Sequence, residues 1–78
     1  MSNYAKGQII VMFPDPTDME GAKKILANIS PKLGIKYFMK TVSIAVVTVP
    51  DGEEQDWMDA INLQPGLVAE LNHTLKLA

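Results

Sequence analysis

The sequence contains no cysteine, no arginine and only one histidine. Without cysteine the chain can form neither a disulfide nor a thiolate metal site. Arginine is the usual bidentate ligand of phosphates and carboxylates, so its absence, together with a net charge of −2, argues against nucleic-acid binding and phosphoryl chemistry. One histidine among scattered carboxylates lacks the spacing of a metal site, and we expect neither a metal nor a cofactor.

Long apolar runs are also missing. No stretch approaches the roughly 18 apolar residues that a membrane-spanning helix needs, and the polar start at residues 1–6 is followed by no signal-type apolar segment. We therefore expect no membrane association. A free-standing protein of this kind is expected in the cytoplasm, whereas a segment cut from a longer precursor could belong to a secreted protein.

The inventory of reactive side chains is equally small. His73 is the only candidate base, and no predicted arrangement brings it to the serines at positions 2, 30 and 43. We read His73 most simply as a residue that packs at the end of a strand, and we do not expect an enzyme. The acidic residues 51, 53, 54, 56 and 59 are most simply a solvated helix face rather than a calcium or catalytic site.

What the sequence does contain is four β-type segments. Residues 41–50, TVSIAVVTVP, form the longest apolar, β-branched run, which predicts a central strand buried on both faces. Residues 7–13, GQIIVMF, predict a second central strand. The lysine-bearing segment 35–40 suits an edge strand, with a turn near residues 40–42, and residues 67–73 predict a short final strand.

Two helices are expected between these strands. Thr17 and Glu20 have the spacing of a capping box, and apolar residues then recur at three- and four-residue intervals up to Ile29. Asp51, followed by Glu54, offers the second helix start. The inner edge of this second helix is predicted at Glu54, Trp57, Met58, Ile61 and Leu63.

The resulting order is β-α-β-β-α-β, the ferredoxin-like pattern of the α+β class. It predicts a four-stranded antiparallel sheet with both helices on one face, built from residues 7–73, with a frayed start at residues 1–6 and an extended C-terminal tail at residues 74–78. Both central strands carry apolar residues on both of their faces. The sheet face without helices should therefore be apolar too. We expect some partner to cover it.

The C-terminal segment from Thr74 to Ala78 contains neither glycine nor proline to turn it back. Extended, it would reach about 15 Å beyond the domain at about 3.3 Å per residue. Two interpretations stay open from the residues alone. The segment is either a frayed end or a peptide that binds a partner by strand addition.

The sequence resembles the propeptide domains of subtilisin-like serine proteases and the similar stand-alone fungal inhibitors of those proteases. The resemblance extends from about Gly7 to Ala78 and rests on GQIIVMF, on Pro50 after the central strand, and on the order of the last motifs. These are QPGLV at residues 64–68 and ELNH at residues 70–73, followed by a short apolar tail. Their order and spacing are more specific than any one motif.

The resemblance implies that the open face of the sheet packs on two parallel surface helices of a protease. Glu70 and Asn72 would cap those helices; the family usually has aspartate where Asn72 stands, so part of the charge term is lost. The tail would lie in the substrate cleft like a product, with Ala78 nearest the catalytic serine. The remaining positions that the resemblance implies are Leu75, Lys76 and Leu77 in the cleft, with His73 and Thr74 supporting them.

The expected function is therefore inhibition or assisted folding of a subtilisin-like protease by a chain that is monomeric when free. The main alternative is a regulatory or assembly module whose open face is covered by a second copy, as a homodimer. A sensor of small metabolites is a weaker third possibility, because no glycine-rich turn or convergent charge marks a pocket.

Overall fold

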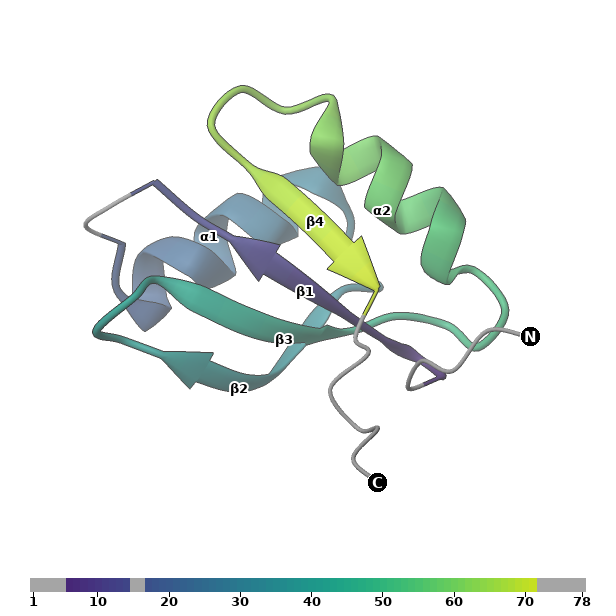
Figure 1. The fold of residues 1–78 in the computed structure, drawn as a ribbon, viewed down its shortest axis with the longest axis horizontal. Coiled ribbons are helices and arrows are strands. Elements are labelled where there is room, and N and C mark those ends of the chain that lie inside the picture. Colours follow the sequence, from purple (N-terminus) through teal and green to yellow (C-terminus); the bar gives the residue numbers. More distant parts are fainter. Residues whose placement is uncertain (1–5, 15–16, 72–78) are drawn as a thin grey trace.

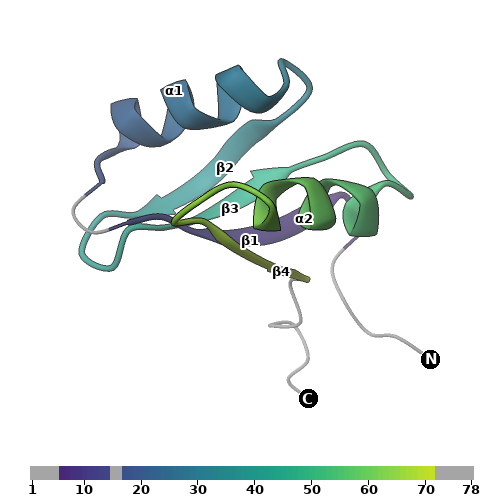
Figure 2. The same ribbon diagram turned by 90° about the horizontal axis from the view of Figure 1, so that it is seen from above.

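The structure is a computed structural model in which residues 6–14 and 17–71 are described. It contains one four-stranded antiparallel sheet with both helices on one face (Figures 1 and 2). The elements are β1 (Gln8–Met12), α1 (Met19–Ile29), β2 (Gly34–Met39), β3 (Ile44–Thr48), α2 (Glu54–Asn62) and β4 (Val68–Leu71). This order, with the sheet arranged β2-β3-β1-β4, confirms the predicted α+β, ferredoxin-like fold.

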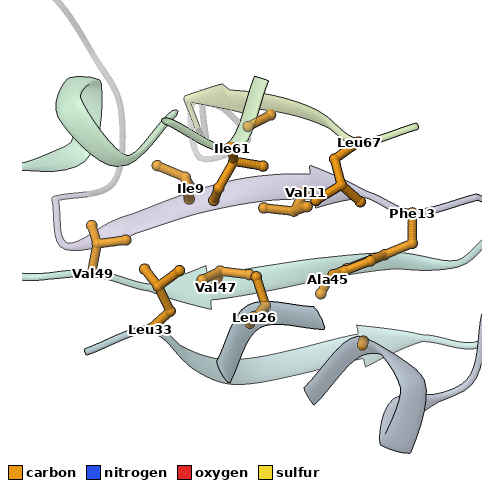
Figure 3. Packing of buried hydrophobic residues seen from close by; sticks show 12 residues of the cluster. Ile9, Val11, Phe13, Leu26, Leu33, Ala45, Val47, Val49, Ile61 and Leu67 are labelled. Atoms are coloured by element: carbon orange, nitrogen blue, oxygen red, sulfur yellow. The ribbon is translucent and has the colours of Figure 1, made fainter. Parts of the chain in front are cut away.

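The hydrophobic core lies between the sheet and the two helices (Figure 3). Ile9 and Val11 of β1 are fully buried, as is Val47 of β3, and their strand neighbours in the sequence are not. Leu26 of α1 and Ile61 of α2 pack onto them from the helix side. Successive side chains of a strand point to opposite faces, so this pattern shows that the core occupies one face of the sheet.

Strands β1 and β3 are shorter than predicted, β2 is displaced by one residue, and one prediction about burial is wrong. β3 has a buried face at Ala45 and Val47, but its other face, with Ile44 and Val46, is only half-buried. The predicted strand at residues 41–50 also included Val42, which lies in the exposed β2–β3 turn. β3 is central, as predicted, but only one of its faces is covered.

Helix α1 begins one residue later than the capping box predicted. Its N-cap is Asp18, whose carboxylate accepts a hydrogen bond of 2.8 Å from the Gly21 amide. Thr17 is held elsewhere, because its amide donates to the Ser43 hydroxyl at 3.1 Å and its own hydroxyl donates to the carbonyl of Pro14. The tie between Thr17 and Ser43 fixes the connection that enters α1.

Helix α2 begins at Glu54 after an N-cap residue, Glu53, that makes no side-chain capping bond. The prediction that the helix starts at Asp51 is therefore wrong, because the N-cap residue is Glu53. Glu54 and Ile61 are buried, as predicted for the inner edge, but Leu63 follows the helix and is 83% exposed. Glu54 was also expected on a solvated acidic face, and its burial corrects that expectation.

Strand β2 contains an irregularity that its sequence pattern did not predict. The register pairs Ile35 with Val47 and Tyr37 with Val46, so Lys36 is an extra residue. Phe38 consequently lies on the core side of the sheet, as Ile35 does. The centroids of the Phe38 and Phe13 rings are 6.4 Å apart, and the rings pack edge to face. Simple alternation along the strand would put Phe38 on the face opposite Ile35.

The outer edge of β4 is covered by a side chain of α2. The Asn62 carboxamide donates to the carbonyl of Ala69 at 3.1 Å and accepts from the Ala69 amide at 2.8 Å. These are the two bonds that a neighbouring strand would make at that residue. Asn62 therefore substitutes locally for a fifth strand and attaches the end of α2 to the sheet.

Replacing Asn62 by alanine should destabilise the domain by about 1–3 kcal/mol, because both backbone groups of Ala69 lose their partner. Asn62→Asp keeps the acceptor but loses the donor, so its cost should depend on pH and should not exceed that of alanine when the carboxyl is protonated. Urea unfolding followed by circular dichroism measures both. A matched loss in Gln64→Ala, two residues further along, would contradict the assignment.

Candidate functional site

The face of the sheet opposite the helices carries a continuous set of apolar side chains, which we call the open face. The register arranges it in rows across the four strands. One row is Met39, Ile44, Met12 and Val68; the next is Tyr37, Val46, Ile10 and Glu70; the third contains Gly34, Thr48 and Gln8.

Every apolar member of the two full rows retains solvent exposure. Tyr37 is 59% exposed and Val68 48% exposed, and the others are half-buried by one another. Both helices lie on the opposite side (Figure 2), so no described element covers these side chains. An apolar patch of this continuity on a small domain is typical of a surface that binds a partner.

Polar residues border the open face on two sides. Gln8 and Thr48 form the third row, towards the β3–α2 end of the sheet. Glu70 occupies the end of the second row, exposed and opposite Ile10. The patch thus has an apolar centre with a carboxylate at the β4 edge, next to Leu71, the last residue of that strand.

Of the predicted site residues, the structure describes only Glu70. Glu70 lies on the open face, where its carboxylate borders the apolar side chains. The predicted cleft residues Leu75, Lys76, Leu77 and Ala78, and the predicted capping and supporting residues Asn72, His73 and Thr74, lie outside the described residues.

A second site was not foreseen from the sequence. The Glu54 side chain is 2% exposed and accepts hydrogen bonds from two backbone amides, at 2.5 Å from Gly7 and 3.1 Å from Gly52. Gly7 precedes β1, whereas Gly52 lies in the turn before α2, and both have positive φ. Only the position of Glu54 on the predicted inner edge signalled its burial, because its partner Gly7 is distant in sequence.

These bonds lower the pKa of Glu54 below its ordinary value. The largest cause is the hydrogen bond from the Gly7 amide, which favours the ionised carboxylate; burial opposes it, and the Gly52 amide and the Lys6 charge support it. The arrangement holds the start of β1 against the start of α2. The hydrogen bonds from Gly7 and Gly52 make this connection. Separately, the described residues contain no group of three or more acidic, histidine or cysteine side chains that could hold a metal ion.

Within the described residues, neither helix has the length and apolar character required to cross a membrane. Comparisons of the chain with protein-family models, with curated proteins and with solved structures found no match. The functional argument therefore rests on the residues of this chain, with the open face as the main feature.

The Glu54 connection should make stability depend on pH. Because the folded-state pKa is lowered, the stabilisation is complete above the ordinary carboxyl pKa of 4.5 and is lost as the pH falls through the folded-state value. At pH 7, Glu54→Gln should lower the free energy of unfolding by about 1–3 kcal/mol, because the bonds to a charged acceptor are weakened.

The difference between wild type and Glu54→Gln should shrink as the pH falls below 4.5, which denaturant unfolding across pH 3–7 measures. Asp56→Asn, at an exposed position in the same helical turn, is the matched control and should change stability little. A gap between Glu54→Gln and wild type that is constant over this range would contradict the role of the carboxylate.

Proposed function

We propose that this chain inhibits a subtilisin-like serine protease and can assist the folding of that protease. The single observation that supports this proposal is the uncovered apolar open face with Glu70 at its β4 edge. A flat apolar sheet surface packs well against the ridges of surface helices, and its burial would supply most of the binding free energy.

Glu70 gives this docking an orientation. Its exposed carboxylate can accept hydrogen bonds from the free amides at the N-terminus of a partner helix, and its charge is favourable at that end of the helix dipole. The position opposite Ile10 places the carboxylate directly beside the apolar rows. A partner helix lying on the open face would therefore have its N-terminus near Glu70.

The C-terminal residues would supply inhibition. Residues 75–78 follow β4 by only a few positions, so docking of the open face determines where they can reach. In the substrate cleft they would bind as an extended, product-like segment, with Ala78 nearest the catalytic serine. Docking of the sheet and binding of the tail then reinforce each other as two linked contacts.

The alternative function is a regulatory or assembly module that forms a homodimer through the same face. The rows of Met12, Ile44 and Val46 favour it, because two copies can stack such apolar rows against each other. Sedimentation equilibrium distinguishes the two functions. A monomer that changes mass only when a subtilisin is added supports the inhibitor, and a tight dimer that ignores the protease supports the module.

Deleting residues 75–78 should abolish inhibition of a subtilisin while leaving the fold and its unfolding midpoint unchanged, because these residues follow the last strand. Removal of residues 1–4 at the other end is the control and should leave inhibition intact. Inhibition is measured by the residual hydrolysis of a chromogenic peptide. Undiminished inhibition by the chain that lacks residues 75–78 would overturn the proposal.

Replacing Glu70 by alanine should weaken binding to the protease by about 1–2 kcal/mol, because the amides at the partner helix lose a charged acceptor. Glu70→Gln should lose only the charge contribution, about 0.3–1 kcal/mol. Gln8→Ala on the polar side of the open face is the control. Titration calorimetry measures all three, and equal affinities for wild type and Glu70→Ala would reject the capping role.

A further inference from the structure

The two edges of the sheet are treated differently by the rest of the chain. β4 forms one edge and β2 the other (Figure 1). On β4, the Asn62 carboxamide occupies both backbone groups of Ala69. β2 has no equivalent side chain among the hydrogen bonds of the described residues, so the two edges differ in their capacity to accept another strand.

The register shows which residue of β2 is open. Ala69, Val11, Ala45 and Phe38 form one row across the sheet. Backbone bonding in antiparallel sheets alternates from one side of a strand to the other. Because Ala69 bonds outward to Asn62, Val11 bonds towards β3, and Ala45 bonds back towards β1.

The backbone hydrogen bonds on either side of this row fit that alternation. The Phe13 amide donates to the Ser43 carbonyl and the Val49 amide donates to the Gly7 carbonyl, so both bonds join the β1 segment to the β3 segment. Phe38 is therefore paired with Ala45 without backbone bonds between them. Its N–H and C=O point to the free side of β2. One end of the row is covered by Asn62, and the other end, at Phe38, has no backbone partner among residues 6–14 and 17–71.

A hollow lies beside this available position. It has a volume of about 360 Å³ and is lined by Phe38 and Lys40 of the β2 side and by Asp18, Met19 and Glu20 at the start of α1. Met19 is 40% exposed. A second hollow of about 480 Å³ adjoins it, sharing Asp18 and Lys40.

A residue added opposite Phe38 would point its side chain to the same face as Phe38, which is the helix side. Such a side chain would enter the hollow and contact Phe38 and Met19. The hollow thus provides the side-chain pocket that strand addition needs for specificity, next to the backbone groups that provide affinity.

Charge identifies the chemistry of the added strand. Lys32, Lys36 and Lys40 are exposed at or next to β2, whereas Asp18 and Glu20 lie only at the α1 end of the hollow. An added segment therefore gains from acidic residues beside Lys36. If two copies paired through β2, the lysines of one copy would lie against the lysines of the other. Repulsion between these like charges disfavours such a pairing.

From these observations we propose that the free edge of β2 binds an extended acidic peptide segment of a partner protein as a fifth strand. Backbone bonds form at Phe38, an apolar side chain occupies the hollow beside Met19, and acidic side chains lie near Lys36. This surface is the free backbone edge of β2, which is distinct from the open face of the sheet. The chain could thus bind a second partner while its open face is occupied.

The test uses an end-blocked decapeptide of alternating valine and glutamate, with a valine–lysine decapeptide as its control, and amide exchange measured by NMR on the full chain. In the free protein the Phe38 amide should exchange rapidly. The acidic peptide should slow it by at least about tenfold and shift the resonances of Met19 and Lys36. The Ala69 amide, already bonded to Asn62, is the internal reference and should not change.

Lys36→Glu should weaken the binding of the acidic peptide by about three- to fivefold. Lys23→Glu, on the exposed side of α1, should leave the affinity for this peptide unchanged. The proposal is overturned if the acidic peptide leaves the Phe38 amide unaffected at millimolar concentration, or if it shifts Ile10 and Val46 of the open face instead. Equal binding of the lysine peptide overturns it as well. So does a free protein that sediments as a dimer with its Phe38 amide already protected, because a second copy would then occupy the edge.

Discussion

The two-residue period of β1 is the constraint on which the rest of the structure depends. Ile9 and Val11 are fully buried against the helices, and a shift of one residue in register would move both to the other side of the sheet. Since β1 pairs with β3 and with β4, its register determines which face of each neighbour is covered. Both helices pack on the face that carries Ile9 and Val11, and the alternate residues Ile10 and Met12 lie on the open face.

The order of the elements and most of the core could be predicted from the sequence, because both depend on local periodicity. The apolar residues of α1 recur with the helical period, and those of β1 alternate with the strand period. The half-exposed open face follows from the same alternation once both helices lie on one side. Glu70 was predicted as a contact residue from the resemblance alone, and the pairing of β4 with β1 places it on the open face.

The features that sequence reasoning missed depend on contacts between distant residues. Thr17 and Asp18 can both cap a helix, and the choice is made by Ser43, which binds the Thr17 amide. A carboxylate such as Glu54 is normally solvated on a helix, and its burial requires the Gly7 amide from the beginning of β1. The extra residue in β2 likewise follows from pairing with β3, which no alternation within β2 itself reveals.

The Asn62 carboxamide has a consequence for the behaviour of many copies at high concentration. Endless edge-to-edge growth of sheets into ribbons requires two free edges per molecule, because each added copy must offer a new place for the next. Here one of the two is already occupied by the molecule's own side chain. Pairing of another strand with β4 is therefore blocked at Ala69, which hinders the growth of a continuous ribbon of sheets in that direction.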